Sequence, residues 1–451
     1  MTRSVRGIAL TLALAIVVVG EVVPSSGAAT ATRNWHWYYG TVTHVRDGDT
    51  IIVDITEPER APHTTDGYPG WAIRAYGINA FADRRQLGYE CWGPDATHRM
   101  EQEVGDRARA DLYLQRRYSN APGDPYEGQR VKLRGNIDSS ADAFGRLAMR
   151  VFVEVDGQWV DVAGRLLKAG LGLPSPSSEL TDAQNRAYRR KAWKARTDHR
   201  RIWSGDGCGG GPANDAILRL RVRWEADGDD DANLNGEWVQ VINEGADAVS
   251  LGGWQLRDLA MQDPYVFPNI TLDAGERVTV FGGAGTSSGL TRYWRNQAGS
   301  RDGQLFSGSG DGIVLLDPGG DIRAYQEFPC LFECRDALSG KVTVSAMYDP
   351  PGGDTPMTEW VDIRNVSDGP VDLYDHYLSN DGDTYLFDVP TVLAPGQSVR
   401  VRVGGNPNND TRFERFWGKT RTILQSSGDR VELLGLDGRE VACYGWGGER
   451  C

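Results

Sequence analysis

Two aspartates and two arginines lie in sequence segments whose residue types could bind a metal ion and a phosphate group. The segment THVRDGDTIIVDI (residues 43–55) places Asp47 and Asp49 at a turn between apolar runs, and carboxylate oxygens are ligands that calcium prefers. Arg74 follows in IRAYGINAFAD and Arg146 closes DAFGR; a guanidinium binds two phosphate oxygens at once and stays charged. Each segment alone also fits a plain hairpin or a solvated arginine, so the case rests on all four side chains together.

Strand and helix signals surround these residues. Residues 38–55 form two apolar runs broken by Asp-Gly, a strong hairpin signal, and further strands are predicted at 71–78, 129–137 and 146–155. Helical spacing is found at 95–117, 160–171 and 178–203, and we interpret the last, basic segment as a scaffold helix packed on the barrel. A few strands around two or three helices predict a five-stranded barrel of the OB type.

Three segments of this region resemble the staphylococcal nuclease (thermonuclease-like) family: residues 43–55, 73–83 and the DAFGR motif. The resemblance covers residues 37–204. It implies calcium held directly by Asp49 with Asp47 nearby, and two phosphate-binding catalytic arginines, Arg74 and Arg146. The implied substrate is DNA or RNA, single-stranded or flexible.

The chain departs from the family pattern in the middle segment. Asn79 stands where the family has a second carboxylate ligand, and Ala82 stands where it has the general-base glutamate. The backbone carbonyl of Ala80 remains as an implied ligand. Loss of a general base typically lowers a rate about 10²–10⁴-fold, and Asp83 and Glu90 are the candidates to replace it. We therefore expect phosphate binding with weakened hydrolysis.

The remainder of the chain repeats itself after a Gly-rich linker at residues 205–215. GEWVQVINEGADAVSLGGWQL from Gly236 returns as TEWVDIRNVSDGPVDLYDHYL from Thr358, and GSGDGIVLLDPGGDIRAY returns as SSGDRVELLGLDGREVACY. The period of about 120 residues is that of a whole domain, and the short alternating strands predict immunoglobulin-like sandwiches. We therefore expect a mainly β chain with two sandwiches, at residues 216–334 and 339–451.

Both sandwich segments resemble the lamin tail domain, whose bacterial members carry the NLNGEWV run found here at Asn233–Val239. The second unit keeps Glu359 and Trp360 without the Asn-Leu-Asn prelude. The resemblance implies attachment modules, whose envelope or extracellular partner the sequence does not identify.

The N-terminus and the cysteines indicate export. Arg3 and Arg6 precede an apolar core of about 14 residues, and Ala29-Thr30-Ala31 has the form of a cleavage site, so residues 1–31 read as a signal peptide of a secreted protein. An uncleaved anchor is the alternative; after cleavage no membrane span is expected. The six cysteines suit disulfides, for which we predict the pairs Cys91–Cys208, Cys330–Cys334 and Cys443–Cys451, although spacing does not fix the connectivity.

Charge limits the choice of function. The chain carries a net charge of −13, which argues against a general nucleic-acid coat, while residues 33–205 carry about three more basic than acidic side chains. Three hypotheses remain: a weakened calcium-dependent nuclease, a non-catalytic binding protein that still holds phosphate, and a structural adhesin with a degenerate barrel. Whether the chain is an enzyme stays open at this point.

Overall fold

The computed structural model describes most of the chain after residue 33. The ranges are 34–81, 83–84, 88–105, 128–139, 141–142, 144–209, 215–259, 264–297, 305–307, 310–332 and 334–451. The predicted signal peptide and Ala82 lie outside them. Residues 35–451 belong to one compact unit. Within the described ranges, no helix has the length and apolar character needed to cross a membrane.

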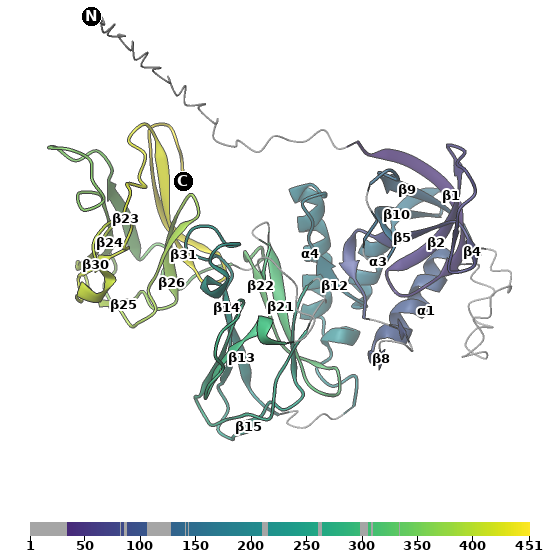
Figure 1. Cartoon of the computed structure of the whole chain (residues 1–451), viewed down its shortest axis with the longest axis horizontal. Coiled ribbons are helices and arrows are strands. Elements are labelled where there is room, and N and C mark those ends of the chain that lie inside the picture. The colour runs from purple at the N-terminus through teal and green to yellow at the C-terminus, as the bar shows by residue number, and fades with distance from the viewer. Residues whose placement is uncertain are drawn as a thin grey trace, which may run out of the picture. The chain divides into compact units, whose positions relative to one another are not determined.

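The N-terminal region is a closed five-stranded barrel (Figure 1). Neighbouring strands run in the order β10-β5-β2-β1-β9, and β9 pairs back onto β10 to close the ring. The Asp-Gly turn joins β1 to β2 as predicted, and β11 extends the sheet from β10. The strands are β1 His36–Val45, β2 Thr50–Glu57, β5 Trp71–Ala75, β9 Arg130–Gly135, β10 Leu147–Val155 and β11 Gln158–Asp161.

Among the described residues, the helices α1, α3 and α4 and short strand pairs accompany the barrel. Met100 and Val104 of α1 are fully buried, as the helical spacing predicts, and α3 ends at Gly170, whose φ of 73° lies in the left-handed region that glycine tolerates. Thr181 and Gln184 form a capping box at the start of α4. The elements are α1 Gly93–Val104, α3 Val162–Ala169, α4 Asp182–Thr197, η1 Arg201–Trp203, β3 Thr64–Thr65, β4 Tyr68–Pro69, β6 Gly77–Asn79, β7 Asp83–Arg84, β8 Gly88–Tyr89 and β12 Leu173–Ser175.

The first sandwich is built from two four-stranded sheets, β13-β14-β19-β20 and β17-β16-β21-β22, and the pair β15-β18. Its core includes the fully buried Trp254 between the sheets. Its strands are β13 Leu218–Arg223, β14 Trp238–Asn243, β15 Val249–Ser250, β16 Gln255–Asp258, β17 Tyr265–Val266, β18 Thr271–Leu272, β19 Arg277–Phe281, β20 Thr291–Tyr293, β21 Asp311–Leu316 and β22 Ile322–Phe328, with 3-10 helices η2 Leu234–Gly236 and η3 Trp294–Asn296.

The second sandwich repeats this topology strand for strand, as β23-β24-β29-β30, β27-β26-β31-β32 and the pair β25-β28. The internal repeat in the sequence is therefore a repeat of the fold. Its strands are β23 Val342–Met347, β24 Trp360–Asn365, β25 Val371–Asp372, β26 His376–Asn380, β27 Asp383–Leu386, β28 Val392–Leu393, β29 Ser398–Arg402, β30 Glu414–Phe416, β31 Asp429–Gly435 and β32 Glu440–Trp446, with η4 at Pro407–Asn409.

Three disulfides join the cysteines in the pairs that the sequence analysis predicts. Cys91–Cys208 spans 117 residues, from the start of α1 to the Gly-rich segment before the first sandwich. Cys330–Cys334 lies between the two sandwiches in sequence, and Cys443–Cys451 closes a short loop at the C-terminus.

Candidate active site

Two arginines converge on one buried carboxylate. Arg74 lies on β5 and Arg146 lies directly before β10; since β5 and β10 are parallel neighbours, the two side chains reach the same end of the barrel. Arg74 Nε lies 3.9 Å from Asp49 Oδ2, and Arg146 Nη1 lies 3.6 Å from Asp49 Oδ1. The structure therefore brings together three residues that are distant in sequence.

The Asp-Gly turn holds the carboxylate in place. The Asp49 backbone N–H donates to Asp47 Oδ1 at 3.1 Å, and the Thr50 hydroxyl donates to Asp49 Oδ1 at 2.7 Å. Arg146 adds a hydrogen bond to the same hydroxyl at 3.1 Å. Burial and the adjacent Asp49 charge raise the pKa of Asp47 to about 7. Near neutral pH this turn therefore carries less negative charge than two ordinary aspartates.

Asp142 is a further acidic residue of the site, and its role was not predicted from the sequence. Its carboxylate accepts from Arg146 Nε at 2.8 Å and from the Arg146 backbone N–H at 3.0 Å. Burial opposes ionisation, but the hydrogen bonds and charge of Arg146 outweigh it and lower the pKa of Asp142. Asp142 thus stays charged and orients the guanidinium, a role that its place in the DAFGR motif indicates.

Asn79 takes a structural part in the site. Its side-chain oxygen accepts from Arg74 Nη2 at 3.0 Å, and its side-chain nitrogen donates to the backbone carbonyl of Leu259, in the first sandwich, at 2.8 Å. Asn79 is only 6% exposed. An aspartate at position 79 would have no N–H to donate to the Leu259 carbonyl. Asparagine in place of aspartate therefore stabilises the contact between barrel and sandwich.

The residues do not fit a calcium site in this arrangement. Asp49 Oδ2 accepts from the backbone N–H of Ala80 at 3.2 Å and faces Arg74, while Oδ1 faces Arg146, so both oxygens are engaged. Asn79 directs its oxygen at Arg74. In the part of the chain that the structure describes, no cluster of three or more His, Cys, Asp or Glu side chains is arranged to hold a metal ion. Calcium binding remains a prediction of the resemblance.

Of the two candidates to replace the general base, the structure describes the side chain of one, Glu90. Ala82 lies outside the described residues, and of Asp83 only the backbone, in β7, is described. Glu90 forms an ion pair with Arg257 of the first sandwich. This ion pair directs the Glu90 carboxylate at the sandwich. Asp83 stays a candidate from sequence alone.

An apolar contact with the first sandwich lies beside the site, and the sequence analysis missed it. Phe81 belongs to a buried cluster with Leu259, Val314 and Leu316 of the sandwich. The barrel also contributes Leu173, Ala195, Ile202 and Trp203. The signal was present in the repeat: GIVLL in the first unit is apolar at consecutive positions, which indicates a strand buried on both faces, while the second unit reads RVELL.

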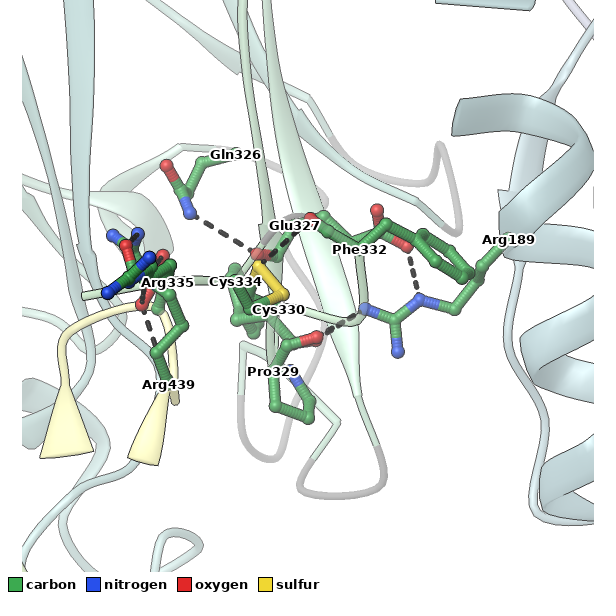
Figure 2. Close-up of a disulfide and its surroundings, with 11 residues drawn as sticks. Arg189, Gln326, Glu327, Pro329, Cys330, Phe332, Cys334, Arg335 and Arg439 are labelled. Carbon is green, nitrogen blue, oxygen red and sulfur yellow. Dashed lines mark hydrogen bonds and ion pairs between the residues drawn. A yellow bond between two sulfur atoms is a disulfide. The ribbon is translucent and has the colours of Figure 1, made fainter. Parts of the chain in front are cut away.

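A second contact joins α4 to the same sandwich at the Cys330–Cys334 disulfide (Figure 2). Arg189, 3% exposed, donates from Nη2 to the Pro329 carbonyl at 2.7 Å and pairs with Glu327. On the other side of the disulfide, Arg439 of the second sandwich donates to the Arg335 carbonyl at 3.2 Å. One short segment thus contacts both the barrel and the second sandwich.

Comparison with known proteins identifies the sandwiches. Residues 223–327 and 336–448 match the model of the lamin tail domain family, so the chain carries two lamin tail domains. For the barrel, which is consistent with an OB or nuclease-like fold, no nuclease family model matches. No curated protein matches the chain.

Proposed function

We propose that this protein is an exported, nuclease-like phosphate-binding protein with weak or no hydrolysis, whose barrel binds nucleic acid through Arg74 and Arg146. The single observation that carries the proposal is the convergence of these two guanidiniums on Asp49 from separate elements. Their side chains are 22% and 13% exposed, so both are held in place and still reach solvent. A positioned pair of this kind suits a phosphodiester, whose oxygens accept from both.

Charge balance sets the strength of binding. Asp49 and Asp142 neutralise the two arginines, and a phosphate must compete with these carboxylates for the same N–H groups. Since the pKa of Asp47 is raised to about 7, this residue adds little opposing charge below neutral pH. We therefore expect modest affinity, in the micromolar range that is typical of non-specific nucleic-acid binding at physiological salt.

The lamin tail domains serve as attachment modules in this proposal. The apolar contact at Leu259 and Val314 and the disulfide Cys91–Cys208 support a fixed association of the first domain with the barrel. The partner to which the modules attach is an envelope or extracellular component. Export itself rests on the N-terminal sequence, and mass spectrometry of the secreted protein tests it by locating the mature N-terminus after Ala31.

A non-catalytic binding protein is the second candidate. The hydrogen bond from Asn79 to Leu259 favours it, because a residue that the resemblance assigns to the metal is instead committed to an interdomain contact. A purely structural adhesin is less favoured, because such a protein has no need of two arginines aimed at one buried carboxylate.

The test is binding and cutting of single-stranded DNA and RNA by the mature protein, with calcium and with chelator. We expect Arg146→Ala to weaken binding about tenfold, the loss typical of a charge-assisted contact of about 1.4 kcal/mol. Arg186→Ala, at an exposed position of α4, removes the same charge elsewhere and serves as the matched control. Equal affinities of the two variants would contradict phosphate binding at this site.

Hydrolysis separates the two candidates. Calcium-dependent cutting that disappears in Arg146→Ala identifies a working nuclease and leads to Asp83→Ala as the next variant. Binding without cutting identifies the non-catalytic protein. Cutting that survives Arg146→Ala comes from a contaminant.

A further inference from the structure

The outer surface of the barrel carries a second group of residues suited to a ligand. Strand register places Trp37 of β1 opposite Arg134 of β9, and Tyr39 opposite Lys132. On the other side of β9, Lys132 lies opposite Phe152 of β10. Because side chains alternate along each strand, these residues share one face, opposite the buried Tyr38, Val131 and Leu133. We call the aromatic–basic face the set Trp37, Tyr39, Lys132, Arg134, Phe152 and Trp159.

Lys132 is the centre of this face. Its Nζ lies 4.0 Å from the ring centre of Trp37, 5.6 Å from that of Tyr39 and 5.8 Å from that of Trp159. Arg134 lies 5.0 Å from the Trp37 ring. Among the described residues, neither Lys132 nor Arg134 forms an ion pair, whereas their neighbours Arg130 and Arg150 pair with Glu57 and Asp161. Two cations without an acidic partner are thus set among aromatic rings.

The rings are held at an angle to one another; Trp37 is exposed, Tyr39 and Trp159 are half-buried, and Phe152 is buried. Trp37 and Phe152 have ring centres 5.7 Å apart and are tilted by 56°, and Tyr39 and Trp159 lie 6.0 Å apart at 68°. Trp37 keeps 44% of its surface exposed. An exposed tryptophan costs free energy in water, and an exposed ring packed beside other aromatic rings and cations is typical of a binding surface.

We propose that the aromatic–basic face binds single-stranded nucleic acid, with bases stacking on Trp37 and Trp159 and phosphates contacting Lys132 and Arg134. Aromatic rings offer stacking to any base, and two unneutralised cations complement a polyanion. Neutral sugars also stack on tryptophan, but they gain nothing from the cations. The face stands apart from the Asp49 cluster, so it does not depend on the function proposed for that cluster.

The two sites lie along one strand. Arg146 directly precedes β10, and Arg150 and Phe152 follow it at even spacing, so all three belong to the outward-facing series of residues. At about 3.3 Å per residue, Arg146 and Phe152 are about 20 Å apart along the strand. A single strand of the length that one OB fold typically covers, about 4–16 nucleotides, spans this distance.

The experiment measures affinity for a fluorescent oligothymidylate of about 15 nucleotides by anisotropy, with the full mature chain and its disulfides intact. We expect Trp37→Ala to weaken binding about tenfold, because stacking on one aromatic ring is lost, and Trp37→Phe to stay within about threefold of the wild type because a ring remains. Lys132→Ala lowers the salt dependence by about 0.7 in the slope of log K against log salt.

Phe413→Ala is the matched control, since Phe413 is also an exposed ring, 38% exposed, next to an arginine, but in the second lamin tail domain. Wild-type affinity of both Trp37→Ala and Lys132→Ala would overturn the proposal. So would displacement of the oligonucleotide by a neutral oligosaccharide in a manner that depends on Trp37, which would assign the face to carbohydrate.

The double variant Arg74→Ala/Arg146→Ala separates this proposal from the earlier one. Loss of binding in Trp37→Ala but not in the double variant supports the aromatic–basic face and rejects phosphate binding at Asp49. The reverse result rejects the face and keeps the Asp49 site. Partial loss in each supports two sites on one strand of nucleic acid.

Discussion

The two lamin tail domains bury corresponding polar side chains in corresponding contacts. Glu237 accepts the backbone N–H groups of Leu305 and Phe306 in the first domain, and Glu359 accepts those of Ile423 and Leu424 in the second. A buried asparagine likewise serves backbone carbonyls in each domain: Asn243 and Asn365. The repeated motif thus encodes the interior of the fold.

Their outer faces differ at three corresponding positions. Three residues of the first domain contact the barrel: Arg257, Leu259 and Val314. The strand registers align them with Ser379, Asp381 and Glu432 of the second domain. Glu432 is partly exposed and pairs with Arg430. Residues on the outward face of a repeated strand, rather than the shared motif, therefore determine which copy contacts the barrel.

Val314→Glu gives the first domain the outward-facing residue of the second and should weaken the interdomain contact strongly. Val314 is fully buried in the interdomain cluster, and a buried charge without a partner costs about 3–5 kcal/mol. We expect faster hydrogen–deuterium exchange in β21 and η1. Glu432→Val is the control and leaves the exchange of β31 nearly unchanged; an equal response of both variants would contradict the assignment of this face.

Glu237→Ala and Glu359→Ala test whether the two buried glutamates stabilise their domains equally. Each leaves two backbone N–H groups without an acceptor, at a cost of about 1–3 kcal/mol for a lost partner. We expect similar destabilisation of each domain, measured by urea unfolding followed through exchange of its own core strands. A much larger effect in one domain would show that the two glutamates contribute unequally to the stability of their domains.

Asn79→Asp tests the interdomain contact from the side of the barrel. The variant restores the carboxylate of the family pattern but loses the donor to the Leu259 carbonyl, and we expect about 1–2 kcal/mol of weaker interdomain contact. Exchange at β6 and β16 measures it. Asn136→Asp is the control, because the Asn136 side-chain oxygen accepts from the backbone N–H of Asp138 and an aspartate keeps that bond. Gain of calcium-dependent cutting in Asn79→Asp would show that the metal site is one substitution away.

The pair His376–Asp336 makes the stability of the second domain depend weakly on pH. His376 of the second domain, at the position of Trp254 in the first, lies 3.2 Å from Asp336. Burial alone would lower the pKa of His376, but the hydrogen bond and charge of Asp336 outweigh it and raise this pKa. Burial likewise opposes ionisation of Asp336, and the hydrogen bond from His376 is the main influence that lowers its pKa.

The stabilising effect of this pair depends on pH in both directions. The raised pKa of His376 contributes stability that is complete below about pH 6.5 and is lost as the pH rises through the folded value. The contribution of Asp336 is present above about pH 3.8 and is lost as the pH falls through its lowered folded value. We expect the second domain to lose up to about 1 kcal/mol more between pH 6 and 8 in the wild type than in His376→Gln, which lacks the titrating imidazole. If thermal unfolding shows the same pH dependence in both proteins, the pair is not its source.

Much of this fold was predictable because its signals are local. The Asp-Gly turn, the alternation in β1 and β9, the caps of α3 and α4, and the 120-residue repeat each depend on residues close in sequence. The convergence of Arg74, Arg146 and Asp49 followed only from the family resemblance, because no local pattern links residues so far apart.

The interdomain contacts were not predicted, because they depend on pairs such as Asn79 and Leu259, which are 180 residues apart. Nothing in either segment alone specifies the other. The apolar run Ile313–Leu316 did indicate a second buried face, but it did not identify what covers that face.

The disulfide Cys91–Cys208 has a topological consequence. It ties the beginning of α1 to the segment before the first lamin tail domain, where Asp321 also accepts the backbone N–H groups of Gly207 and Cys208. A protease that cuts once anywhere between the two cysteines therefore produces a nicked molecule that remains covalently whole. In the exported protein that we propose, where reductants are scarce, the barrel and the lamin tail domains stay covalently linked after such a cut until the disulfide is reduced.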